Sequence, residues 1–194
     1  MAEQLRVLIE KMKEQQEENL LYHSDFGLLN NVVESQRIST RTGPPTPDDL
    51  DELLTLVWKE PSFFLAHPRA IAAFGRECTR RGVPPPTVTL FGSPFLTWRG
   101  IPLIPTDKLD ISDNSSKTSI LLIRTGEKKQ GVIGLFQTGL TGEQSPSLSV
   151  RLNGINEMGQ FVYLISLYTS AAVLTDDALA SLDNVEIGNY YEYK

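Results

Sequence analysis

The residues most able to carry nucleophilic or metal chemistry are one cysteine and two histidines. Cys78 lies close to several arginines, and nearby cations can lower the pKa of a thiol and make it reactive. His23 and His67 are far apart, and neither has a cysteine or histidine neighbour at metal-ligand spacing. Lone helix cysteines are usually packed hydrophobes. We therefore interpret Cys78 as a core residue and His67, which precedes an expected helix, as a structural or capping residue.

Carboxylates that act together are the usual groups of acid–base catalysis and of calcium binding. The sequence gathers aspartates in three places, which are Asp48 with Asp49 and Asp51, Asp107 with Asp110 and Asp113, and Asp176 with Asp177. The first and third clusters stand at expected helix starts, where acidic side chains stabilise the helix dipole, so we interpret both as capping clusters. The middle cluster lacks the glycine and the terminal glutamate of a calcium loop.

The sequence also shows no motif of a phosphate-binding loop. The glycine-containing stretch 126–142 has no Gly-rich fingerprint followed by a helix. Lys128 and Lys129 lie in an expected turn, and we interpret them as a solvated pair. The sequence therefore predicts no catalytic residue, no cofactor-binding residue and no metal ligand, and we expect the chain not to be an enzyme.

The composition excludes several classes of protein. Of the 194 residues, 40% are hydrophobic and 22% are charged, as in ordinary globular domains. The net charge of −6 comes without a basic stripe, so we expect no nucleic-acid partner. A single cysteine cannot form an internal disulfide and argues for a reducing cytoplasm. The most apolar stretch, 163–174, is shorter than the roughly 20 residues that span a bilayer, so we expect no membrane insertion.

Three helices are expected in the first half of the chain. Apolar residues at helical spacing predict the first helix over 2–21. Thr46 as N-cap and Pro47 as first residue predict a second helix. Its expected buried face consists of Leu50, Leu53, Leu54, Val57 and Trp58. Pro68 opens a third expected helix that runs to Arg81, with Gly82 as its stop.

The second half of the chain reads as short strands separated by turns. Expected strands cover 36–42, 87–91, 95–99, 101–104, 120–123, 132–136, 148–152 and 162–173. The turn 125–131 is expected to join two of these strands as a hairpin, and 176–182 to form a helical turn before a last strand at Val185 and Ile187. We expect the tail 190–194 to be exposed. Helices followed by strands, without βαβ alternation, predict an α+β fold in two lobes.

Long strings of this sequence resemble the family 2A encapsulin shell proteins over nearly the whole chain. These strings are Gly43–Leu54, Trp58–Pro61, Phe64–Cys78, Leu96–Pro105, Gly126–Gly131, Gly142–Pro146 and Val173–Leu179. A mycobacterial member of the family has been called major membrane protein I.

The resemblance implies a tailed-phage major capsid-like fold, with a peripheral lobe that contains a spine helix and an axial lobe near the symmetry axes. It implies that residues 1–45 are the end of the spine helix and a peripheral-lobe strand, that 46–147 are the axial lobe, and that 148–194 are return strands of the peripheral lobe. Family members carry an N-terminal arm and an extended loop before this point. Both are expected to be absent from this chain, which resembles the C-terminal portion of a subunit.

The resemblance also implies a function. Copies of the subunit would assemble into an icosahedral cage, a bacterial cytoplasmic nanocompartment, around a cysteine desulfurase cargo of sulfur metabolism. We expect the loops 82–86 and 110–116 to lie at or near subunit borders. Three alternatives stay open, which are a cysteine enzyme that uses Cys78, a membrane-associated antigen, and a capsid-fold scaffold that forms only small oligomers.

Overall fold

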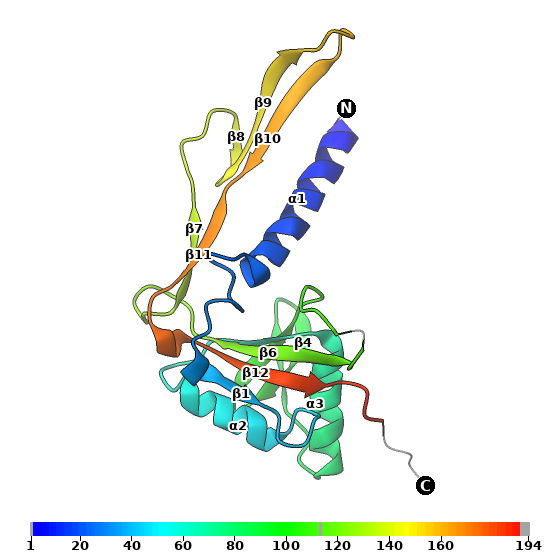
Figure 1. The fold of residues 1–194 in the computed structure, drawn as a ribbon, viewed down its shortest axis with the longest axis vertical. Helices are drawn as coiled ribbons and strands as arrows, with labels where there is room; N and C mark the ends of the chain where they lie inside the picture. The colour runs from blue at the N-terminus through cyan, green and yellow to red at the C-terminus, as the bar shows by residue number, and fades with distance from the viewer. Residues whose placement is uncertain (1, 113, 191–194) are drawn as a thin grey trace.

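The computed structural model describes residues 2–112 and 114–190, and Figure 1 shows a sheet lobe with a long ribbon rising from it. The helices are α1 (Ala2–Tyr22), α2 (Pro47–Leu56) and α3 (Pro68–Arg80), with short 3₁₀ turns at Glu34–Gln36 and Asp176–Ala178. The strands of the sheet lobe are β1 (Arg37–Ser39), β2 (Phe63–Ala66), β3 (Thr87–Leu90), β4 (Ser93–Trp98), β5 (Ile101–Pro105), β6 (Lys117–Ile123) and β12 (Leu179–Glu186). The strands of the ribbon are β7 (Val132–Phe136), β8 (Glu143–Ser145), β9 (Leu148–Ile155), β10 (Phe161–Leu167) and β11 (Thr169–Val173).

The sheet lobe is built on a mixed seven-stranded sheet in the order β1-β12-β6-β2-β5-β4-β3. One face is covered by α2 and α3, as Figure 1 shows. Alternate residues of the central strands point into this layer and are fully buried, as in strands with one packed face. The fully buried residues of the layer include Leu50, Leu53, Phe64, Phe74, Ile120, Leu122, Ala180 and Leu182. This layer is the main hydrophobic core.

The opposite face of the sheet is covered by the end of α1 and the segment that follows it. Leu121 and Ile123 point to this side, because neighbouring residues of a strand face opposite ways. They pack against Leu21, Leu28 and Val32 in a second, smaller core. The helix α1 is thereby held against the sheet at its C-terminal end, while its N-terminal end extends along the ribbon (Figure 1).

The ribbon comprises residues 132–173 and is an insertion between two neighbouring strands of the sheet lobe. The chain leaves after β6, runs out along β7 and β9, turns back through β10 and β11, and returns as β12, which pairs with β6. At its base β7 pairs with β11, and farther out β9 pairs with both β8 and β10. A hydrogen bond from Gln16 Nε2 to Thr169 Oγ1, 3.1 Å long, ties α1 to the ribbon near this base.

Both predicted helix starts are confirmed in detail. Thr46 accepts a hydrogen bond from the Asp49 backbone N–H, and the Asp49 carboxylate accepts one from the Thr46 backbone N–H, which is a complete capping box. His67 caps α3, because its Nδ1 accepts from the backbone N–H of Arg69 at 3.1 Å. The expected mixture of helices and sheets, an α+β fold, is also confirmed.

The expected hairpin between 120–123 and 132–136 is wrong. The strand β6 pairs with β12 and β2, and β7 pairs with β11. The turn 125–131 does form, with a hydrogen bond of 2.7 Å from the Val132 N–H to the Arg124 carbonyl, but it sends the chain out of the sheet lobe and into the ribbon. Strand partners so far apart in sequence leave no local signal.

Three other expectations also need correction. The single strand expected over 162–173 changes partner at Tyr168, so it forms β10 and β11. The helical turn expected over 176–182 is limited to a 3₁₀ turn at Asp176–Ala178, since the next residues pair with β6 as part of β12. Trp58, expected on the buried face of α2, is 67% exposed because α2 ends at Leu56.

The boundaries at residues 45 and 147 stay a prediction. The seven-stranded sheet takes β1 and β12 from outside the range 46–147, and the ribbon takes β7 and β8 from inside it. Residues Asp113 and 191–194, for which the sequence predicted a carboxylate cluster and an exposed tail, lie outside the described residues.

The capping box gives the first testable prediction. Thr46→Ala should lower the free energy of unfolding by about 1–2 kcal/mol, because the buried Asp49 amide loses its acceptor. Thr46→Ser keeps the hydroxyl and should recover most of the loss. Urea unfolding followed by circular dichroism measures both. An effect no larger than that of Asp48→Ala, at the exposed neighbour that takes no part in the box, would contradict this assignment.

Candidate assembly surface

Cys78 and the two histidines are not brought together. Cys78 is fully buried in the main core, as predicted, and burial raises the pKa of its thiol to about 11. His67 caps the start of the same helix, and His23 stacks on Phe26 at the end of α1. Within the described residues, neither histidine hydrogen-bonds the Cys78 sulfur. The arrangement needed by a cysteine nucleophile is not formed in that part of the chain.

The carboxylate clusters separate into individual contacts. Asp49 caps α2, but Asp51 accepts hydrogen bonds from the Trp98 indole at 2.7 Å and from Arg99 at 2.8 Å. The capping interpretation is therefore wrong for Asp51. Asp177 does lie in the first turn of the 3₁₀ helix at Asp176–Ala178, and its carboxylate also binds Arg124. Among the residues that the structure describes, no group of three His, Cys, Asp or Glu side chains could hold a metal ion.

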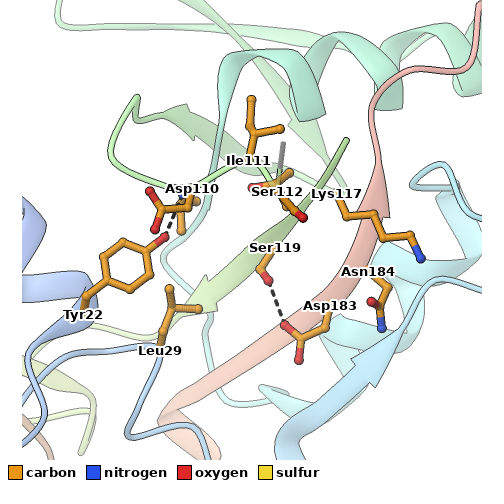
Figure 2. A pocket seen from close by; sticks show the side chains of 11 residues that line it. Tyr22, Leu29, Asp110, Ile111, Ser112, Lys117, Ser119, Asp183 and Asn184 are labelled. Carbon is orange, nitrogen blue, oxygen red and sulfur yellow. Dashed lines mark hydrogen bonds between the residues drawn. The ribbon is translucent and has the colours of Figure 1, made fainter. Parts of the chain in front are cut away.

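A hollow of about 610 Å³ opens on the sheet face beside the end of α1, and Figure 2 shows its lining. Ser119 donates a hydrogen bond of 2.9 Å to Asp183, which also pairs with Arg37 at 3.2 Å. Tyr22 accepts a hydrogen bond of 2.7 Å from the Asp110 backbone N–H. The first two contacts join β6, β12 and β1, and the third joins α1 to the loop before β6. The polar groups of the hollow thus serve as cross-links between elements.

An ion pair between a fully buried arginine and a partly exposed aspartate lies where the ribbon joins the sheet lobe. Arg124 immediately follows β6 and is 0% exposed, and its guanidinium donates to Asp177, just before β12, at 2.7 Å. The same guanidinium donates to the Thr175 hydroxyl at 2.8 Å and reaches the Gln130 carbonyl at 3.4 Å. The hydrogen bonds from Arg124 and Thr175 hold the pKa of Asp177 down, at about 2. Both crossings between sheet lobe and ribbon are therefore fixed to one side chain.

The outer half of the ribbon carries a cluster of exposed apolar side chains. Side chains on both faces of β9 and β10 are exposed, although neighbouring residues of a strand point in opposite directions. The exposed apolar residues are Leu152, Ile155, Met158, Phe161, Val162, Tyr163 and Leu164. A two-stranded hairpin with neither face packed is at best marginally stable in water, and exposed apolar patches of this kind mark interaction sites.

The helix α1 continues this surface. Val7 and Leu8, in its N-terminal half, are about half exposed. Between this half of α1 and β10 lies a groove of about 570 Å³, lined by Leu5, Leu8, Phe161, Tyr163 and Ile165 together with Gln4 and Gln160. We call the exposed residues of β9, β10 and the N-terminal half of α1 the ribbon surface. Its composition fits the apolar, aromatic centre of a protein–protein interface.

Sequence reasoning did not find this surface. It assigned 162–173 to one strand and made no prediction of what covers that strand. The usable signal was the absence of alternation, since four consecutive apolar residues in a strand require cover on both faces. Within the described residues, no second layer supplies that cover.

The ribbon surface has the composition of a protein–protein contact, and comparison with known proteins identifies the family of the chain. The model of the type 2A encapsulin shell protein SrpI-like family matches residues 1–189. The chain is 64% identical over 192 residues to the type 2A encapsulin shell protein SrpI of Synechococcus elongatus, covering 99% of this chain and 62% of that protein. It is 60% identical over 193 residues to a type 2A encapsulin shell protein of Mycolicibacterium paratuberculosis, covering 100% of this chain and 62% of that protein.

A solved structure agrees with the sequence matches. The chain superposes with a TM-score of 0.96, at 63% identity, on a chain of the holo-SrpI encapsulin complex from Synechococcus elongatus, covering 100% of this chain and 68% of that one. The chain therefore belongs to the type 2A encapsulin shell protein family, whose named members are structural proteins and not enzymes. It spans about 62% of the length of the curated relatives that it matches. Among the described residues, none of the helices is long and apolar enough to cross a membrane.

The Arg124–Asp177 pair leads to a prediction about pH. Asp177→Asn should lower the free energy of unfolding at neutral pH by about 1–3 kcal/mol, because the buried guanidinium loses its charged partner. The folded pKa of Asp177 lies below the unfolded value of about 3.9, so the stabilisation is complete above about pH 5 and is lost as the pH falls toward 2. Wild type and variant should therefore converge in acid.

Urea unfolding at several pH values measures this difference. Asp176→Asn is the matched control, because Asp176 is the exposed neighbour of the same charge, and it should change stability by less than about 0.5 kcal/mol. A difference between wild type and Asp177→Asn that does not depend on pH would contradict the assigned pairing.

The burial of Cys78 in the main core can also be tested. Because burial excludes reagent and raises the thiol pKa to about 11, Cys78 should react with a thiol reagent at neutral pH at least about a hundredfold more slowly in the native protein than in denaturant. Absorbance after addition of Ellman's reagent measures both rates. Rapid labelling of the native protein would show instead that the thiol is accessible and ionised.

Proposed function

We propose that this chain forms part of a shell subunit that assembles with copies of itself into the icosahedral cage of an encapsulin nanocompartment. The observation that supports this most directly is the ribbon surface, where both faces of a hairpin carry exposed apolar side chains. Burial of apolar area contributes roughly 25 cal/mol per Å², so covering this surface with neighbouring subunits would stabilise an assembly.

A cage forms when one surface meets a different surface of the next copy through a rotation that closes. Each contact can be modest, since many identical contacts act together. The shape of the subunit then decides whether the rings close. The Arg124 contacts support this role, because they fix the direction in which the ribbon leaves the sheet lobe. We also propose that the loops 82–86 and 110–116 lie near subunit borders.

We further propose that the cage encloses a cargo enzyme in the bacterial cytoplasm, and that the cargo is a cysteine desulfurase of sulfur metabolism. The resemblance of the sequence strings to family 2A shell proteins supports this proposal. Co-expression of the chain with a cysteine desulfurase, followed by sedimentation of assembled particles, tests it. Desulfurase that stays in the supernatant while particles sediment would contradict the cargo assignment and leave the shell assignment intact.

The shell assignment itself is tested on the ribbon surface. Ile155 and Phe161 pair across β9 and β10, and both are more than half exposed. The double variant Ile155→Asp, Phe161→Asp should raise the apparent dissociation constant of assembly at least about tenfold, because carboxylates cannot be buried unpaired in an apolar contact. Light scattering and negative-stain microscopy measure the size of the assemblies.

The matched control is Asn153→Asp, which adds a carboxylate at an exposed polar position of the same strand. It should assemble as the wild type does. A double variant that still assembles normally would contradict the role of the ribbon surface. Wild-type particles of only a few copies would favour a small oligomeric scaffold over a closed cage.

A further inference from the structure

A pocket that combines an exposed tryptophan with lysines is formed by the segment before β2 and the turn after β6. Its volume is about 480 Å³, and we call it the Trp58 pocket. It is lined by Trp58, Lys59, Glu60, Lys128, Lys129 and Gln130. Trp58 is 67% exposed, whereas Trp98 is buried at 5% exposure. Tryptophan side chains are seldom so exposed. Tryptophan is enriched among the interface residues that contribute most of the binding free energy.

Two segments that are far apart in sequence form the pocket on a rigid base. The segment 58–62 leads into β2 and the turn 124–131 follows β6, and these strands pair with Phe63 opposite Ile123. The Thr125 N–H and hydroxyl each donate to the Ser62 hydroxyl at 3.0 Å. Lys129 and Glu60 join the rims by an ion pair of 2.7 Å. A binding site supported in this way needs little reorganisation on binding.

The lysine turn is also fixed from below. The carbonyl of Gln130 accepts hydrogen bonds from the Thr175 hydroxyl at 2.9 Å and from Arg124 at 3.4 Å. Gly131 permits the tight approach, since a Cβ there would lie 2.4 Å from the Arg124 carbonyl oxygen. The turn that carries Lys128 and Lys129 is therefore held by the same buried guanidinium that fixes the ribbon.

The charges in the pocket have the opposite sign to the chain as a whole. Three lysines and one glutamate line it, on a protein whose net charge is −6. Lys59 lies over the Trp58 ring, 5.1 Å from its centroid, and 4.0 Å from the Asp177 carboxylate. Lys129 is paired with Glu60. Lys128 makes no hydrogen bond or ion pair within residues 2–112 and 114–190. An anion that enters the pocket therefore meets the ammonium of Lys128 beside the exposed indole of Trp58.

We propose that the Trp58 pocket binds an acidic peptide segment of a partner protein. An apolar side chain of the peptide lies on the Trp58 indole, and carboxylates on either side of it pair with Lys128 and Lys59. Nucleic acid fits less well, because its phosphates need a row of cations and the Glu60 carboxylate lies inside the pocket. The proposal concerns a surface separate from the ribbon surface, so it does not depend on shell assembly.

The test uses the full chain and a short synthetic peptide in which a central phenylalanine is flanked by aspartate and glutamate. Trp58 is the exposed one of two tryptophans, so its fluorescence reports binding directly. We expect saturable binding that weakens as the salt concentration rises from about 0.05 M to about 0.5 M. Lys128→Glu should weaken it at least about tenfold, and Lys128→Arg should weaken it far less.

Lys11→Glu is the matched control, because it makes the same charge change at an exposed position on α1, and it should leave peptide binding unchanged. A peptide with lysine in place of the acids should not bind. Equal binding to Lys128→Glu and wild type would overturn the proposal. So would a preference for a single-stranded oligonucleotide, or a Trp58 signal that changes with protein concentration alone, which would identify the occupant as a second copy.

Discussion

The contact between Arg124 and Asp177 is the interaction on which the shape of the molecule depends. Sheet lobe and ribbon are joined by two chain crossings, one after β6 and one before β12. A guanidinium with five fixed donors is suited to hold both, because it can bind a carboxylate and still reach a hydroxyl and a carbonyl. In the closed assembly proposed above, any error in subunit angle would be multiplied over all copies, and a stiff junction would limit that error.

Apolar residues occur in two settings, a buried core in the sheet lobe and an exposed surface on the ribbon. The sheet lobe buries its large side chains between the sheet and α2 and α3 at the density of a protein interior. The ribbon has no such core, and its outer strands expose residues that a solitary protein would cover. The residues that could have carried chemistry also make structural contacts. Cys78 is core, His67 is a helix cap, and Asp51 anchors Trp98 and Arg99.

Local signals predicted local structure well. The Thr46 capping box and the His67-Pro68 start of α3 depend only on neighbours in sequence, and both helices begin as expected. Features set by distant partners were missed. The hairpin assigned to β6 and β7 fails because the true partners are β12 and β11, and Trp58 follows the helix period but lies beyond the helix end. The Asp177 contact was missed because Arg124 is 53 residues away in sequence.

The position of β12 in the sheet has a consequence for biosynthesis. This strand lies between β1 and β6, yet it follows every other strand of the described chain, and its Asp183 contacts Arg37 across 146 residues. Two open strand edges must therefore wait on the ribosome until β12 emerges, and unpaired edges are prone to aggregate. The hairpin of β9 and β10, whose strands pair locally, can form first. The nascent polypeptide thus displays its adhesive hairpin before its scaffold is closed, which favours translation under chaperone protection.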